Sequence, residues 1–265
     1  MSKAPTYGQM WPKYARWWDA MKLTRPSTTQ VIAEKILDHK SRYQAVEKLT
    51  GVPWYWIGIT HIREGDGDFR TSLAQGDRWD RVSVHEPDGR GPFRSWEEAA
   101  VDALVTLKHM DRVQDWRLEK LLFWFELYNG WGYHGRGIPS PYVWGATSVQ
   151  KPGKYIADHV WSSATMDNQL GAAAMLAALM RLDPSIKPQR ETAEVADDGE
   201  DIAVKPIPVP RTPVPSRTKT VGIGAGIVAA VAAVAAWADA HPVVIIGAVA
   251  MAVLAVIVAM GLREK

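Results

Sequence analysis

Residues 53–69 read PWYWIGITHIREGDGDF, and this segment decides how the rest of the chain can be organised. Pro53 suits the first turn of a helix, and the apolar residues that follow it recur at helical spacing. Gly65 comes directly after Glu64 and ends the pattern, since glycine favours the position just beyond a helix. The segment therefore predicts an apolar helix that begins near Pro53 and carries Glu64 on its last turn.

Helical patterns flank this segment on both sides. The stretch before it keeps apolar residues near helical spacing and stops at Gly51. Further along, Ser95 and Glu98 fit a capping box, which opens a helix that continues to Leu107. The remaining helices are expected over residues 31–49, 117–128 and 166–182.

One small β element is expected between these helices. The chain from Gly65 to Phe93 is rich in glycine, aspartate and arginine, which is typical of loops. Within it, residues 81–85 (RVSVH) alternate in polarity and predict part of a small hairpin. Residues 1–182 are therefore expected to form one domain that is mainly α with a small β-hairpin.

The chain changes character after residue 182. Residues 183–220 contain seven prolines and mixed charges, which predicts an extended, disordered linker. Two apolar segments follow, 221–238 and 243–262, each near the length that spans a bilayer. The sequence thus predicts a C-terminal pair of transmembrane helices joined by a short turn.

Basic residues lie on both sides of the predicted transmembrane pair. Arg217 and Lys219 precede it, and Arg263 and Lys265 follow it, so both termini are expected in the cytoplasm at the inner membrane. Gly222 and the glycine four residues later offer a small-residue surface on which homo-oligomers could form.

Composition narrows the chemistry. The net charge of +2 gives no case for nucleic-acid binding, and the absence of cysteine excludes thiol nucleophiles, disulfides and cysteine zinc sites. No histidine pair has a recognisable metal-binding spacing, so neither a metal nor a cofactor is expected. Thirteen tryptophans could fill a core or stack on sugar rings.

Glu64 is the first candidate for a catalytic group. Its helical face also carries Ile57 and His61, and partial desolvation by such neighbours raises the pKa of a carboxyl group. A carboxyl group that stays protonated near neutral pH can donate its proton to a glycosidic oxygen. The alternative is a solvated glutamate in a C-terminal helical turn.

Three motifs carry a resemblance, in the order HIREGDGDF (61–69), SLAQGDRWD (72–80) and YNGWGY (128–133). Together they resemble the phage and bacterial lysozyme-like peptidoglycan hydrolases, over about residues 30–180. Goose-type lysozymes and soluble lytic transglycosylases carry Glu-x-x-x-x-Phe at the catalytic acid, which Glu64 and Phe69 match. The transglycosylases also carry an Ala-Tyr-Asn-Ala-Gly segment that residues 128–130 resemble.

The chain also departs from the transglycosylase pattern. Gly65 stands where a serine usually follows the catalytic glutamate, and the Gly-Leu-Met-Gln strand is missing. The resemblance therefore implies a lysozyme-like α+β fold and a muramidase more than a transglycosylase in the narrow sense.

Hydrolysis needs a second group that orients water, commonly a carboxylate opposite the acid. Asp77 lies thirteen residues after Glu64 and Asp88 lies twenty-four after it, and goose-type enzymes are similar in carrying acidic residues at about those offsets. Asp77 is the first choice and Asp88 the second.

For substrate binding, polar groups and flat rings in and beside the glycine-rich loop are expected to hold N-acetylated sugars, with core packing as the alternative for each ring. These residues are Tyr128, Asn129, Gly130, Trp131, Tyr133 and Tyr142.

The expected function is a phage endolysin-type muramidase that cleaves the β-1,4 bond between N-acetylmuramic acid and N-acetylglucosamine in peptidoglycan glycan strands. A lytic transglycosylase or a chitinase-like glycosidase is the alternative. An alternative of another class is a holin-like membrane protein with a glycan-binding domain. Because the wall lies outside the inner membrane, the enzyme would be held inside until the membrane is breached, or its own hairpin would help to breach it.

Overall fold

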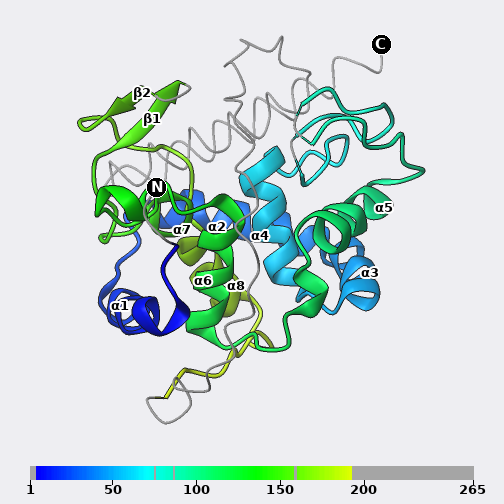
Figure 1. Ribbon diagram of the computed structural model, residues 1–265. Coiled ribbons are helices and arrows are strands. Elements are labelled where there is room, and N and C mark those ends of the chain that lie inside the picture. The colour runs from blue at the N-terminus through cyan, green and yellow to red at the C-terminus, as the bar shows by residue number, and fades with distance from the viewer. Residues whose placement is uncertain (1–3, 75, 86, 158–159, 193–265) are drawn as a thin grey trace, which may run out of the picture.

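The computed structural model describes residues 4–192 except 75, 86 and 158–159, and Figure 1 shows their arrangement. Helices dominate and one small antiparallel sheet accompanies them, so the predicted class, mainly α with a small β element, is confirmed at that level. The α-helices are α1 (Tyr7–Ala20), α2 (Pro26–Asp38), α3 (Lys40–Thr50), α4 (Trp54–Gly65), α5 (Trp96–Val101), α6 (Leu118–Asn129), α7 (Pro141–Trp144) and α8 (Ala172–Leu182). The other elements are the π-helix η1 (Asp102–Leu107), the 3-10 turns η2 (Met110–Arg112) and η3 (His134–Arg136), and the strands β1 (Lys154–Ala157) and β2 (Val160–Ser162).

Helix α4 lies in the middle of the described part of the molecule, with other helices packed around it (Figure 1). Its residues from Trp56 to Ile62 are all buried, as the nearly continuous apolar pattern predicts. Gly58 permits close approach of the neighbouring helices, because a Cβ atom there would lie 2.6 Å from Ile36 Cγ2 and 3.2 Å from Tyr43 Cε2. The predicted helix that starts at Pro53 and carries Glu64 on its last turn is confirmed.

The single helix predicted over residues 31–49 is wrong. The chain forms two helices there, α2 and α3, and the break falls at His39, whose backbone leaves the helical region. The bend lets α2 pack against α8 while α3 packs against α4 and α5. The His39 ring also contacts Phe69, with centroids 4.8 Å apart. Tertiary packing thus breaks a helix that contains neither glycine nor proline at the break.

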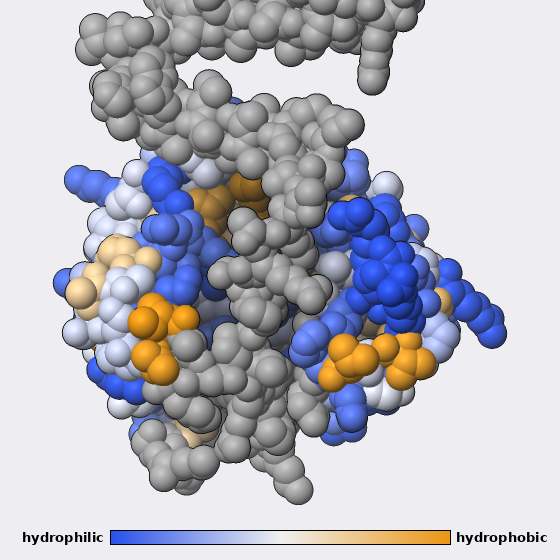
Figure 2. Space-filling model, turned by 90° about the horizontal axis from the view of Figure 1, so that it is seen from above, coloured by the Kyte–Doolittle hydropathy of each residue, from blue (hydrophilic) through white to orange (hydrophobic). Residues whose placement is uncertain are grey.

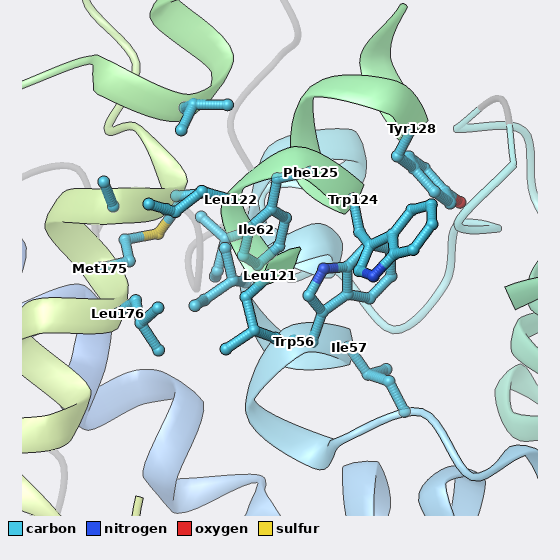
Figure 3. Close-up of a cluster of buried hydrophobic side chains, with 14 of the residues drawn as sticks. Trp56, Ile57, Ile62, Leu121, Leu122, Trp124, Phe125, Tyr128, Met175 and Leu176 are labelled. Atoms are coloured by element: carbon cyan, nitrogen blue, oxygen red, sulfur yellow. The ribbon is translucent and has the colours of Figure 1, made fainter. Parts of the chain in front are cut away.

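The core between α4, α6 and α8 is shown in Figure 3. Trp56 of α4 stacks on Phe125 of α6 with ring centroids 5.0 Å apart, and it meets Tyr128 edge-on at 5.4 Å. Met175 and Leu176 of α8 are fully buried in the same cluster. Burial of large aromatic side chains contributes about 2–3 kcal/mol each, so this core fixes α4 firmly against α6. The last turns of both helices, with Glu64 and Tyr128, are positioned by it.

The sheet lies elsewhere than predicted. Strands β1 and β2 pair antiparallel, with Tyr155 opposite Trp161 and Lys154 opposite Ser162. The predicted hairpin around residues 81–85 is wrong, because those residues form a loop.

In that loop, side-chain oxygens accept hydrogen bonds from backbone N–H groups. The Asp77 carboxylate accepts the N–H groups of Val84 and His85, and Ser83 Oγ accepts the N–H of Arg90. Ser83 is buried while Val84 is 78% exposed, which reverses the polarity that the alternating pattern suggested. A strand ladder cannot form where side chains have taken its hydrogen bonds.

Three predicted helix boundaries have different outcomes. Ser95 caps α5 as predicted, since its Oγ accepts the N–H of Glu98 at 3.1 Å, and the helix runs on through η1 to Leu107. The helix predicted over 117–128 is confirmed as α6. The helix predicted over 166–182 starts at Ala172 instead, because Gly171 packs tightly on Gly145 and the preceding residues form a turn on Asp167.

Residues 183–192, which begin the predicted linker, lie against the domain. The Leu118 N–H donates to the Gln189 carbonyl at 2.8 Å, and the buried Glu119 carboxylate accepts from Arg190 Nε and from the Glu191 N–H, each at 2.7 Å. Ile186 is buried. The rest of the linker and both predicted transmembrane segments, 221–238 and 243–262, lie outside the described residues. Among the helices of the described ranges, none combines the length and the apolar character needed to cross a bilayer.

Candidate active site

Glu64 occupies the last turn of α4, where the chain turns sharply away. Asp66 adopts the left-handed conformation, its N–H donates to the Ile62 carbonyl, and the Gly67 N–H donates to the His61 carbonyl at 3.1 Å. These bonds satisfy carbonyls that a helix end would otherwise leave free. The Glu64 backbone is therefore fixed between a packed helix and a closed cap.

Tyr142 holds the Glu64 side chain. Its hydroxyl donates to Glu64 Oε1 at 2.8 Å, across a sequence separation of 78 residues. The Tyr142 ring is buried on α7 and lies under the Arg63 guanidinium, 4.4 Å from the ring centroid. Arg63 in turn donates to the Leu170 carbonyl at 3.0 Å. Glu64 is thus oriented by a hydroxyl that is itself held by a buried ring.

A buried lysine and a second tyrosine complete the surroundings. Lys108 is 8% exposed, and its Nζ lies 3.3 Å from the Tyr128 carbonyl and 4.5 Å from the centroid of the Tyr128 ring. The Tyr128 hydroxyl donates to the Leu73 carbonyl at 3.1 Å. Lys108 follows the π-helix η1 and precedes His109, which has a φ of 52°. π-helical turns often occur at functional sites, and here the irregular backbone places a cation near Glu64.

Glu64 holds its proton more tightly than an ordinary glutamate does. Burial raises the pKa of Glu64, and this effect outweighs the hydrogen bond from Tyr142 and the charges of Lys108 and Arg63, which lower it. Burial also lowers the pKa of Lys108, while Glu64 opposes that change. Chemically, a carboxyl group with a raised pKa is a better proton donor at mildly acidic pH than an ordinary glutamate, and the anion that it leaves is stabilised by Tyr142, Lys108 and Arg63.

Asp77 lies in a loop, where its carboxylate is heavily hydrogen-bonded. Oδ2 accepts the N–H groups of Val84 and His85 at 2.9 and 3.0 Å, and Oδ1 lies 2.6 Å from His85 Nδ1. Burial alone would raise the pKa of Asp77, but the hydrogen bonds from His85 and Val84 outweigh burial, and the net pKa is lowered. The carboxylate is therefore ionised at neutral pH. Asp88, the second choice, is an exposed residue of the same loop region.

The residues predicted to bind substrate fall into separate places. Tyr128 and Tyr142 lie beside Glu64. Trp131 packs on Phe123 with centroids 5.1 Å apart, while Asn129 and Gly130 form the end of α6 and its cap. The sixth predicted residue, Tyr133, joins a different aromatic group with the strands: its ring centroid lies 5.9 Å from that of Tyr155 and 5.8 Å from that of Trp161.

His61, expected to desolvate Glu64, contacts other groups. Its Nδ1 lies 3.0 Å from the Tyr43 hydroxyl, and its ring packs on Phe69 and Trp96. Burial lowers the pKa of His61 to about 4, so the ring is neutral at physiological pH.

Sequence reasoning did not find Lys108 or Arg63. Lys108 directly follows a helical pattern, where a lysine ordinarily lies in solvent, and no motif marks it. In the described ranges, no three histidine, aspartate or glutamate side chains are grouped so that they could hold a metal ion. Comparison of the chain with models of known families, with curated proteins and with solved structures gave no match.

Proposed function

We propose that the protein is a peptidoglycan hydrolase, a muramidase of lysozyme-like fold, in which Glu64 is the general acid. The observation that carries the proposal is the state of Glu64: a carboxyl group at the end of the central helix whose pKa is raised by burial and whose orientation is set by Tyr142. Glycoside hydrolysis requires such a group to protonate the leaving oxygen.

The second carboxylate supports the same reaction class. The pKa of Asp77 is lowered by its hydrogen bonds, whereas the pKa of Glu64 is raised by burial. Two carboxyl groups with pKa values shifted in opposite directions are the combination that acid-assisted glycoside cleavage uses. Glu64 would donate its proton to the oxygen of the β-1,4 bond between N-acetylmuramic acid and N-acetylglucosamine. Asp77, or Asp88 in its place, would orient the attacking water.

The test is the activity of the full-length Glu64→Gln variant on purified peptidoglycan, measured as new reducing ends. We expect a loss of at least about a hundredfold, since general acid catalysis contributes factors of about 10²–10⁴. Glu126→Gln is the matched control, because Glu126 is a buried glutamate of α6 that bonds to Tyr14. Full activity of Glu64→Gln would refute the assignment.

Two further measurements sort the details. Asp77→Asn and Asp88→Asn identify the water-orienting group by which of them removes activity. Mass spectrometry of the products separates the alternatives: anhydromuramic ends would indicate a lytic transglycosylase, and cleavage of chitin oligosaccharides without action on peptidoglycan would indicate a chitinase-like enzyme.

The same proposal places the catalytic domain on the inner membrane through the segments 221–238 and 243–262, with the domain on the cytoplasmic side until lysis and with oligomers formed through the helices. The apolar length of these segments and the basic residues around them support it. Digestion of the domain by protease added outside intact spheroplasts would contradict this topology. Membrane permeabilisation that persists in Glu64→Gln would favour the holin-like alternative.

A further inference from the structure

Three aromatic rings gather on the small sheet. Tyr155 of β1 and Trp161 of β2 are cross-strand partners with ring centroids 5.0 Å apart. Tyr133, which lies before η3, packs edge-on against both. We call Tyr133, Tyr155, Trp161 and the nearby Arg136 the sheet platform.

Arg136 and a glycine hold the rings in place. The Arg136 guanidinium carbon lies 4.2 Å from the Trp161 ring centroid and 4.9 Å from that of Tyr155, and Arg136 Nε donates to the Tyr155 hydroxyl at 2.8 Å. Trp161 packs directly on Gly153, where a Cβ atom would lie 2.5 Å from the indole. The rings are therefore ordered before any ligand binds, which lowers the entropic cost of binding.

The platform lies in an exposed apolar region. Four of the seven exposed large hydrophobic residues in the described ranges lie on or beside the sheet, and these are Tyr155, Ile156, Val160 and Met166. Figure 2 shows apolar side chains among polar ones on the side where Figure 1 places β1 and β2. Exposed apolar groups that cluster in this way are a common feature of binding surfaces.

The platform is connected to the candidate active site. The positive charge of Arg63 acts on Tyr133, and the same guanidinium lies on the ring of Tyr142, which bonds to Glu64. In Figure 1 the end of α4 lies between the sheet on one side and the loops after α4 on the other. Arg63 is therefore a common neighbour of the platform and of Glu64.

We infer that the sheet platform is a distal glycan subsite, which binds N-acetylated sugar units of the strand beyond the bond that is cut. This inference rests on the proposed function. The exposed Tyr155 ring can pack on the apolar face of a pyranose sugar, and the exposed Arg136 can pair with the carboxylates of the peptide stems that peptidoglycan carries. The shared neighbour Arg63 and the cationic Arg136 favour an acidic glycan strand over a second protein chain as the occupant.

The test uses binding, so that it does not depend on turnover. Full-length Glu64→Gln protein is titrated calorimetrically with N-acetylglucosamine hexamer and with the dimer. The titration is repeated with the double variant that also carries Tyr155→Ala. Loss of one stacking ring should weaken hexamer binding about five- to tenfold, and a ligand that spans both sites should lose more than the dimer does. Leu49→Ala, which removes an exposed apolar side chain from α3, is the control and should leave binding unchanged.

Trp161→Phe provides a second variant that keeps a ring over Gly153 and should weaken binding less than Tyr155→Ala. Unchanged hexamer binding in folded Tyr155→Ala overturns the inference, whether or not self-association changes. If the wild-type protein cleaves peptidoglycan while Tyr155→Ala leaves hexamer binding unchanged, the subsite is refuted and the proposed function is unaffected. Platform-dependent binding by a wild-type protein that does not cleave peptidoglycan would leave the subsite standing and remove the proposed function.

Discussion

Replacing Tyr142 by phenylalanine removes the hydroxyl that donates to Glu64 and leaves the buried ring in place. Hydrogen bonds to charged groups contribute about 1.5–3 kcal/mol, and one pKa unit corresponds to about 1.4 kcal/mol. Because Glu64 keeps part of its surface accessible, we take the lower end of that range. The pKa of Glu64 should therefore rise by about one unit in Tyr142→Phe.

Carbon-13 NMR of glutamate side-chain carboxyl groups measures this pKa directly, with the Glu64→Gln spectrum assigning the signal. Tyr128→Phe is a matched control, since Tyr128 is another buried tyrosine near Glu64, and its hydroxyl donates to the Leu73 carbonyl instead. The alkaline limb of the hydrolysis profile should move up in pH with the carboxyl titration in Tyr142→Phe alone. Equal shifts in both variants, or a downward shift in Tyr142→Phe, would refute the argument.

Two other carboxyl-linked predictions can be tested in the same way. Burial raises the pKa of Glu126 from 4.5 to about 7, although the hydrogen bond from the Tyr14 hydroxyl opposes this. Protonated Glu126 therefore contributes fully to the free energy of unfolding below about pH 4.5, and this contribution is lost as the pH rises through about 7. Glu126→Gln should remove that loss and exceed wild type by about 3 kcal/mol in urea unfolding at pH 8, with the difference vanishing near pH 4; a pH-independent difference would contradict it. Lys108→Met should raise the pKa of Glu64, because it deletes a nearby positive charge, but by less than Tyr142→Phe does; no change in the carboxyl titration would show that the Lys108 charge does not act on Glu64.

The sequence predicted the elements whose burial is nearly complete. Helices α4 and α6 contain long apolar runs with clear ends, and both appear within a residue of the expected bounds. The position of Glu64 on the last turn follows from the same pattern, although the chain turns at Asp66 and Gly67, which have positive φ, and Gly65 is the last helical residue. Local chemistry was sufficient in these segments because the helix, its cap and its apolar surface all agree.

Prediction from the sequence failed where contacts with other parts of the chain determine the backbone conformation. The break at His39 reflects packing of α2 on α8 and of α3 on α4, and residues 81–85 are kept from a strand by the carboxylate of Asp77. The sheet itself contains Tyr155 and Trp161, and the sequence predicts no strand in their segment. Its two short strands carry little of the alternation that predicts a hairpin.

By itself, then, the sequence determined a mainly helical domain and the end of the helix on which Glu64 lies. Only the tertiary structure decided which groups surround that carboxyl group: Tyr142 from α7, Lys108 from the end of η1, and the neighbouring Arg63. The reason is physical. Helical periodicity depends on residues three and four apart, whereas the pKa of a carboxyl group depends on burial and charges brought from tens of residues away.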